Sequence, residues 1–377
     1  MARVGYDRVD MPALPLAPSD LTPEWLTATL RGAGHLGAAS VVSARVEAIG
    51  QGVGVLCQLA RIALAYDRPA PGAPARLVAK LPTTDPQTRG MVSLFRFYER
   101  EVRFYQELAP SVALATPRCW AGALDADSGD FALLLEDLGG ERVVDQLAGA
   151  TAADAALVVD EISALHAAWW GDPRLAELAW LPPVDSDVNR MGLGLYPTAW
   201  ASFLDRFGDA VSPEARAYGD RLGDRALALL EEVGDGPQTV CHGDLRLDNV
   251  FFRATAPTDG AARPVTFIDW QIAGRAVGTY DVAYFVSQSL AADVRRGCER
   301  DLLARYHGAL VAGGVRGYDF AQCEADYRRA VVFCFVYPVM AGGLGDLGNA
   351  RGRALAAAMA ERSATALSDW NAGELLG

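Results

Sequence analysis

The chain has 377 residues, 51% of them hydrophobic and 21% charged, which is enough apolar material for a sizeable core and excludes wholesale disorder. Its formal net charge of −13 argues against nucleic acid or an anionic membrane as the main partner. The six cysteines have no short paired spacing, and the N-terminus lacks the apolar core of a signal peptide. We therefore expect a cytoplasmic protein with reduced thiols, divided into about two or three lobes.

The region up to about residue 140 is predicted to be rich in strands. It begins with a short helix that Thr22 caps and Gly32 ends. Residues 41–67 form two apolar segments around a bend, and the alanine-rich second segment fits a strand or a helix. The bend contains three closely spaced glycines, Gly50, Gly52 and Gly54.

The sequence after this bend predicts a strand, a helix and another strand. Residues 76–81 alternate, which places Val78 and Lys80 on one face of a strand. Residues 131–140 predict a buried strand that runs into a glycine turn. Between them, one continuous helix is predicted over residues 89–110 from apolar side chains at steps of three and four, Phe95, Tyr98, Val102 and Tyr105.

The second part of the chain is predicted to be mainly helical. Helical periodicity covers residues 151–232 and returns at residue 279. Two short apolar strands flank a polar loop between these stretches. The longest apolar run, residues 330–343, is too short to span a membrane and contains Pro338. Strands followed by helices indicate an α+β fold.

A single lysine raises a chemical question. Lys80 is the only lysine among the 34 lysine and arginine residues. Arginine serves almost as well on a solvated surface, so the composition indicates that lysine was replaced wherever it could be. Chance can leave one lysine anywhere, but retention is expected where a compact ammonium is needed instead of a planar guanidinium.

The strongest local motif is "HGDLRLDN", from His242 to Asn249, followed by "FIDW" with Asp269. Phosphoryl transfer needs a carboxylate to accept the proton of the attacking hydroxyl, and oxygen ligands for Mg²⁺. The spacing makes Asp244 the candidate base, and Asn249 and Asp269 the candidate metal ligands. His242 is expected to orient this loop by hydrogen bonding. The alternative is an ordinary polar turn between two strands.

Other parts of a nucleotide site follow in the order that this chemistry requires. The glycine-rich bend precedes Lys80, and Glu101 on the predicted helix is the candidate partner of that lysine, with Glu99 as its rival on another face. The strand that ends in "LLLEDL" is expected to receive the adenine through backbone groups of Glu136 and Leu138. Each feature is weak alone, and their order is what points to phosphoryl transfer.

Seven segments carry a family resemblance: "VAKLP", "REVRFYQELAP", "LLLEDL", "LHAAWW", "CHGDLRLDNVFF", "FIDWQ" and "GTYDVAYF". With them the sequence resembles the aminoglycoside phosphotransferase and choline kinase superfamily, the small-molecule relatives of protein kinases. Within it, the segments look most like the bacterial form of the ecdysteroid-kinase-like branch. The resemblance spans roughly residues 40–290.

The resemblance implies a two-lobed, protein-kinase-like fold. Residues 1–137 would form a nucleotide-binding lobe with an antiparallel sheet and a helix, and residues 138–377 a larger helical lobe with the catalytic loop and the substrate site. It also implies ATP, with GTP not excluded, and Mg²⁺. Lys80 would bind the phosphates. Asp281, in "GTYD", would brace the catalytic loop, cap a helix, or do both.

The expected acceptor is a hydroxyl of a small molecule. The C-terminal region is apolar and aromatic with few acidic residues, which favours a hydrophobic alcohol over an aminoglycoside or a choline-type amine. A catalytically dead nucleotide-binding module is the alternative outside enzymes, although the lysine, the base and both metal ligands are all present. The sequence leaves the acceptor and the oligomeric state open.

Overall fold

The computed structural model describes residues 13–50, 56–112, 114–253, 263–345 and 350–376. They divide into two compact units. The N-terminal unit extends to Pro110 and resumes from Thr116 to Gly140, whereas Ser111–Ala115 and everything from Glu141 belong to the C-terminal unit. The sequence analysis placed this division after residue 137. In the structure the first unit extends three residues further and includes the glycine turn that ends at Gly140.

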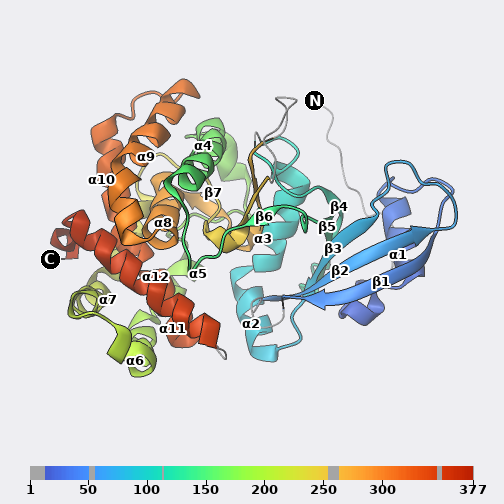
Figure 1. Cartoon of the computed structure of the whole chain (residues 1–377), viewed down its shortest axis with the longest axis horizontal. Coiled ribbons are helices and arrows are strands. Elements are labelled where there is room, and N and C mark those ends of the chain that lie inside the picture. The colour runs from blue at the N-terminus through green and yellow to red at the C-terminus, as the bar shows by residue number, and fades with distance from the viewer. Residues whose placement is uncertain (1–12, 51–55, 113, 254–262, 346–349, 377) are drawn as a thin grey trace. The chain divides into compact units, whose positions relative to one another are not determined.

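The N-terminal unit is built on a five-stranded antiparallel sheet in the order β1–β2–β3–β5–β4 (Figure 1). Its second strand is the alanine-rich segment whose sequence fits a strand or a helix. Its ten residues pair with both neighbouring strands, and this pairing favours the extended form. The strands are β1 Val41–Ile49, β2 Cys57–Tyr66, β3 Arg76–Pro82, β4 Cys119–Leu124 and β5 Phe131–Glu136.

Helix α1, Pro23–Gly32, packs its apolar side chains on one face of this sheet. As predicted, the helix ends at Gly32 and Thr22 is its N-cap, whose hydroxyl accepts a hydrogen bond from the N–H of Trp25. Leu77, Ala79 and Leu81 of β3 are buried in this core. Because side chains alternate along a strand, Lys80 lies on the opposite face.

The predicted helix over residues 89–110 is broken. Helix α2, Pro86–Phe95, ends at Arg96, which has a left-handed backbone with φ of 55°, and α3, Phe97–Arg103, follows and leads into a π-helical turn, Phe104–Leu108. The periodicity of side chains does not reveal a break that keeps apolar residues buried on both sides of it.

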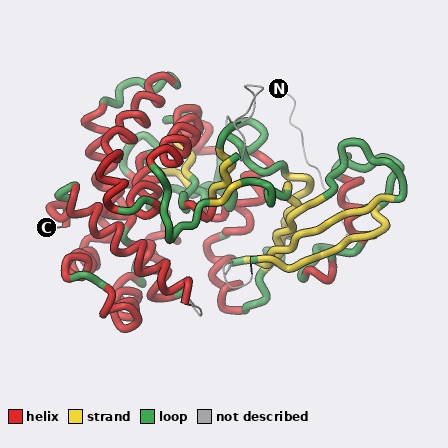
Figure 2. Tube along the Cα trace, in the orientation of Figure 1, coloured by secondary structure: helices red, strands yellow, loops and turns green. Residues whose placement is uncertain are grey.

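The C-terminal unit is mainly helical, as predicted (Figure 2). Helix α8 is its central element, since all eleven of its residues are buried. The helices are α4 Ala152–Trp169, α5 Asp187–Leu193, α6 Tyr196–Phe207, α7 Pro213–Gly234, α8 Thr279–Ser289, α9 Ala292–Ala312, α10 Phe320–Cys334, α11 Val336–Leu344 and α12 Ala350–Asp369.

Short strands in this unit fix the ends of two loops. Strands β7, Thr239–Cys241, and β8, Val250–Phe252, flank the segment His242–Asn249. Strand β8 pairs with β9, Val265–Phe267, and β10, Gly274–Ala276, pairs back to β7. A further strand, β6 Arg142–Val143, pairs with β8. The loop after β7 and the loop after β9 therefore start from neighbouring short sheets.

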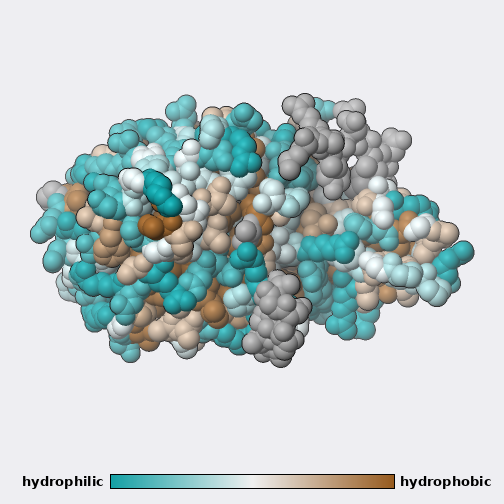
Figure 3. Space-filling view, turned by 90° about the horizontal axis from the view of Figure 1, so that it is seen from above, coloured by the Kyte–Doolittle hydropathy of each residue, from teal (hydrophilic) through white to brown (hydrophobic). Residues whose placement is uncertain are grey.

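The six cysteines are free thiols. In the part of the chain that the structure describes, no helix is both long enough and apolar enough to cross a membrane. The face seen in Figure 3 carries hydrophilic and apolar residues interspersed.

Candidate active site

The loop from His242 to Asn249 is shaped by a glycine that no other residue can replace without strain. Gly243 has φ of 84°, in the left-handed region, and a Cβ added there would lie 2.3 Å from the carbonyl oxygen of Ile272. The "HGD" motif therefore contains a steric requirement as well as polar side chains.

Asp281 holds the backbone of this loop. It is fully buried in the first turn of α8, and its carboxylate accepts hydrogen bonds from the N–H of His242 at 2.7 Å and of Gly243 at 3.0 Å. The helix-cap alternative is wrong, because Gly278 is the N-cap of α8 and Asp281 lies inside the helix. These two bonds are the contacts that a bracing role requires.

The ring of His242 connects the two loops of the site. Its Nε2 lies 2.9 Å from the carbonyl oxygen of Ile268 and donates to it, while Nδ1 accepts from the N–H of Asp244 at 3.3 Å. The buried indole of Trp270 packs against the ring at a centroid distance of 4.6 Å. With both ring nitrogens engaged in this way, the geometry favours an orienting function for His242.

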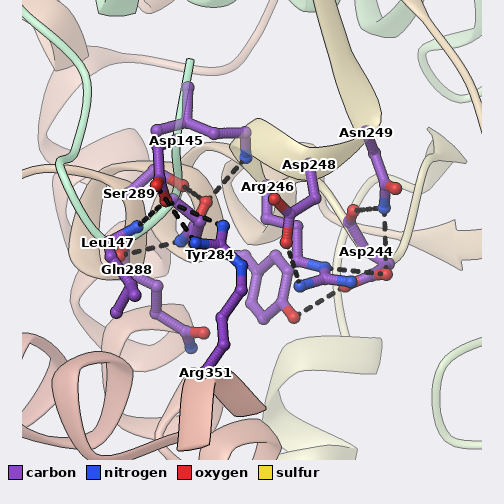
Figure 4. Close-up of polar contacts among 12 residues, drawn as sticks. Asp145, Leu147, Asp244, Arg246, Asp248, Asn249, Tyr284, Gln288, Ser289 and Arg351 are labelled. Carbon is purple, nitrogen blue, oxygen red and sulfur yellow. Dashed lines mark hydrogen bonds and ion pairs between the residues drawn. The ribbon is translucent and has the colours of Figure 1, made fainter. Parts of the chain in front are cut away.

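The carboxylate of Asp244 receives hydrogen bonds on both oxygens (Figure 4). The hydroxyl of Tyr284, on α8, donates to Oδ1 at 2.7 Å. The amide nitrogen of Asn249 donates to Oδ2 at 3.0 Å, and Arg246 Nε lies 3.4 Å from the same oxygen. These donors fix the plane of the carboxylate, which is what a base aimed at one acceptor hydroxyl needs.

Asn249 and Asp269 fit a site for a hard cation. The nitrogen of the Asn249 amide is committed to Asp244, so its oxygen is the atom that can serve as a ligand. The N–H of Ile268 donates to the carbonyl oxygen of Asn249 at 3.0 Å, which brings the two loops together. Asp269 has a left-handed backbone with φ of 65°, unusual for aspartate, and such strain is typical of functional sites.

Arg246 joins the carboxylates of the catalytic loop. Its guanidinium pairs with Asp248 at 2.7 Å as well as with Asp244. Burial lowers the pKa of Arg246, but Asp244 and then Asp248 outweigh it and leave that pKa raised. Arg246 is thus held among the carboxylates of the loop, with its side chain only partly exposed.

In the N-terminal unit, Lys80 and Glu101 form a buried ion pair. The ammonium nitrogen lies 2.7 Å from both carboxylate oxygens, and Glu101, on α3, is fully buried. The rival carboxylate of Glu99 is instead paired with Arg96 and Arg103. Position on the helix thus separates the two glutamates as the sequence suggested.

The remaining predicted nucleotide residues are described in part. Gly50 follows β1 with φ of 69°, as a bend requires, whereas Gly52 and Gly54 lie outside the described residues. Glu136 ends β5, and its N–H donates to the carbonyl oxygen of Arg118 at 2.9 Å, which leaves its own carbonyl as the group to consider for an adenine. Leu138 follows in the half-buried turn, and its use of backbone groups stays a prediction.

Three buried side chains that support the loop were not predicted from sequence. Tyr284 bonds the carboxylate of Asp244, and the ring of His166 lies 3.2 Å from Asp281. Gln146 accepts a hydrogen bond from the N–H of Leu247 at 2.8 Å. The sequence offered a signal only for Tyr284, in "GTYDVAYF", where it follows Asp281 by three residues and so shares its face of the helix.

His166, Cys241 and Asp281 also bring their ligand atoms within 4.8 Å of one another, an arrangement that can hold a metal ion. Both oxygens of Asp281 already accept hydrogen bonds from the loop backbone, however, and the second nitrogen of His166 lies 3.0 Å from the hydroxyl of Tyr306. The cluster is therefore explained as hydrogen bonding that supports the loop.

Breaking the buried ion pair should destabilise the protein. In Lys80→Met the Glu101 carboxylate stays buried without its cation, and we expect the free energy of unfolding to fall by about 3–5 kcal/mol. The double variant Lys80→Met/Glu101→Leu removes both charges and should recover most of that loss. Denaturant unfolding of the three proteins measures this, and a double variant no more stable than Lys80→Met would contradict the coupling.

Replacing the loop glycine should also be costly. Gly243→Ala combines an unfavourable φ with a clash against Ile272, so we expect a loss of about 2 kcal/mol or more in the free energy of unfolding. Gly317→Ala is the matched control, because Gly317 has φ of 73° and open space around it. Thermal or denaturant unfolding measures both variants. If the two lose the same free energy of unfolding, the contact with Ile272 adds no cost and the prediction is wrong.

Comparison with known proteins gives solved structures with a similar fold. Choline kinase from Cryptosporidium parvum Iowa II is similar in structure, with a TM-score of 0.52 and 11% identity over 88% of this chain and 92% of that one. The GDP and kanamycin complex of APH(2")-IIIa gives a TM-score of 0.51 and 15% identity over 89% and 92%. A search among curated proteins gave no significant match.

At these identities the solved structures establish the fold alone, and they confirm the predicted α+β, kinase-like class. The ecdysteroid-kinase-like branch is tested by none of them and stays a prediction. A family model described as "Phosphotransferase enzyme family" matches residues 72–322, which is more than half of the chain. The chain therefore belongs to the phosphotransferase enzyme family.

Proposed function

We propose that this phosphotransferase moves the γ-phosphate of ATP, with Mg²⁺, to a hydroxyl of a small and predominantly hydrophobic molecule. The observation that carries the proposal is the carboxylate of Asp244, which is held by hydrogen bonds on both oxygens inside a loop whose backbone is bonded to Asp281. A carboxylate fixed in this way is suited to take a proton from one defined direction.

The Lys80–Glu101 pair supports binding of a nucleoside triphosphate. An ammonium held by a buried carboxylate presents a fixed positive charge, which phosphate oxygens bind. Solved relatives with similar folds are complexes with GDP, which supports a nucleotide as the donor and keeps GTP as an alternative to ATP. Glu136 and Leu138 are proposed to meet the base through backbone groups.

The two oxygen ligands of Asn249 and Asp269 are proposed to hold Mg²⁺, which would neutralise charge on the phosphates when bound. The amide nitrogen of Asn249 faces Asp244, so the same side chain would position the base and present its oxygen to the metal. Asp244 would accept the proton as the acceptor oxygen forms its bond to phosphorus and the bridging oxygen of the donor leaves with the nucleoside diphosphate.

The charges near the catalytic loop favour a weakly charged acceptor over a polycation. Asp248 is paired with Arg246, and Asp145 lies 2.9 Å from Arg351 (Figure 4). The pKa of Arg351 is raised, by Asp145 first and by Asp248 to a smaller extent. These carboxylates are already neutralised by arginine, whereas an aminoglycoside would need carboxylates to meet its ammonium groups.

Aromatic side chains lie beside the base. The ring of Tyr337 meets that of Tyr284 edge to face at 4.9 Å, and Phe333 lies 5.9 Å from Tyr337. Tyr284 and Phe333 are buried, whereas Tyr337 is half-buried and is the one of these three rings that an apolar acceptor could reach. A hydroxylated terpenoid, steroid-like or acyl compound is therefore the proposed acceptor class, with an aminoglycoside or choline-type amine as the second candidate, because solved relatives include a choline kinase and a kanamycin complex.

The role of Asp244 can be tested before the acceptor is known. Slow hydrolysis of ATP, with water as the acceptor, should be measurable in the wild-type protein and should fall by about 10²- to 10⁴-fold in Asp244→Ala, while nucleotide affinity stays unchanged. Asp160→Ala, a surface carboxylate paired with Arg305 in the same unit, is the control and should keep full activity.

Two outcomes of this assay would count against the proposal. Equal hydrolysis by wild type and Asp244→Ala would favour the catalytically dead, nucleotide-binding alternative. A collapse of nucleotide affinity in Asp244→Ala, measured by calorimetry, would show that this carboxylate has been given the wrong role.

The acceptor class is tested by a transfer screen. Purified protein with Mg²⁺ and either ATP or GTP is incubated with aminoglycosides, choline, and steroid and terpenoid alcohols, and the product mass is read directly. We expect a hydrophobic alcohol to gain the mass of one phosphoryl group. Phosphorylation of an aminoglycoside instead would show that the paired carboxylates near the loop do not determine acceptor charge.

A further inference from the structure

We infer that Tyr284 is a positioning residue for the base, and that it turns Asp244 so that Oδ1 meets the acceptor hydroxyl. The inference rests on the proposed function of Asp244.

The geometry of the contact is well defined. Tyr284 is buried in α8, and its hydroxyl donates to Asp244 Oδ1 at 2.7 Å, a short bond between a phenol and a carboxylate (Figure 4). Its ring is held by the edge-to-face contact with Tyr337 at 4.9 Å. The donor therefore has little freedom to move, and the bond can orient the carboxylate.

The two oxygens of Asp244 differ in what they can still accept. Among the residues that the structure describes, Oδ2 faces two donors, from Asn249 and Arg246, whereas Oδ1 faces Tyr284 alone. A carboxylate oxygen has two lone pairs. One lone pair of Oδ1 is therefore left for an acceptor hydroxyl, and the bond from Tyr284 sets the direction in which it points.

The phenol is suited to act as a permanent donor. Burial raises the pKa of Tyr284, and the neighbouring carboxylate of Asp244 raises it further, so the hydroxyl stays protonated throughout the neutral range. It cannot compete with Asp244 for the proton of the acceptor. Its function is thus to hold the base rather than to exchange a proton.

The position of Tyr284 in the helix links it to the backbone of the loop. Asp281 precedes it by three residues, so both side chains project from one face of α8. Asp281 holds the N–H groups of His242 and Gly243, while Tyr284 holds the side chain of the next residue, Asp244. One buried helix therefore determines both where the loop lies and how its base is turned.

The test is Tyr284→Phe, which removes the hydroxyl and keeps the ring. We expect kcat for ATP hydrolysis, and for any acceptor found, to fall by about 10- to 100-fold, with the KM for nucleotide unchanged. Tyr327→Phe is the matched control, because the buried hydroxyl of Tyr327 donates to the carboxylate of Glu299 at the same distance of 2.7 Å. This control should lose comparable thermal stability and keep wild-type kcat.

A double-variant cycle separates positioning from general damage. If Tyr284 acts through Asp244, Tyr284→Phe/Asp244→Ala should be no slower than Asp244→Ala alone. A further loss in the double variant, or wild-type kcat in a folded Tyr284→Phe, would overturn the inference. Wild-type activity in Asp244→Ala would instead refute the proposed function itself.

A second pair of variants covers the case in which Tyr284→Phe does not fold. Tyr284→His keeps a ring that can donate toward Oδ1, and Tyr284→Leu keeps only apolar volume. Higher kcat in the histidine variant, at equal nucleotide affinity, supports positioning by a donor. Equal kcat in the two variants overturns it.

Discussion

One buried carboxylate determines the arrangement of the catalytic loop in the C-terminal unit. Asp281 is inaccessible to solvent, and burying its charge is unfavourable unless donors surround it. The donors are the N–H groups of His242 and Gly243, with the ring of His166 nearby. The left-handed conformation of Gly243 lets two successive N–H groups converge on one anion. The helix and the loop therefore stabilise each other.

The far end of the same loop is held from a different part of the chain. Gln146 accepts the N–H of Leu247, and the guanidinium of Arg362, on α12, donates to the carbonyl oxygens of Gln146 and Leu147. A segment before α4 and the last long helix thus support residues that lie about a hundred positions away from each. The Lys80–Glu101 pair joins two elements of the N-terminal unit, β3 and α3.

The sequence was sufficient for the features that depend on local spacing. The α+β class, the cap of α1, the strand that carries Lys80 and the choice of Glu101 over Glu99 all follow from periodicity and order along the chain. The break at Arg96 was missed because apolar residues continue on both sides of it. His166 and Gln146 were missed because their partners are set by tertiary packing, which spacing alone does not encode. Tyr284 was missed although its spacing of three residues from Asp281 was a signal that it shares the face of that aspartate.

The single lysine can now be considered beside the arginines. The guanidinium of Arg362 donates to the carbonyl oxygens of Gln146 and Gln288, which belong to two chain segments. Arginine suits such a position because it carries several donors in one plane. Lys80 instead places one nitrogen 2.7 Å from both oxygens of one buried carboxylate. A guanidinium bound to Glu101 through its fork would direct its donors within one plane. A tetrahedral ammonium can bind that carboxylate and still direct its charge to a partner outside the plane, as the proposed role of Lys80 in binding a nucleotide needs.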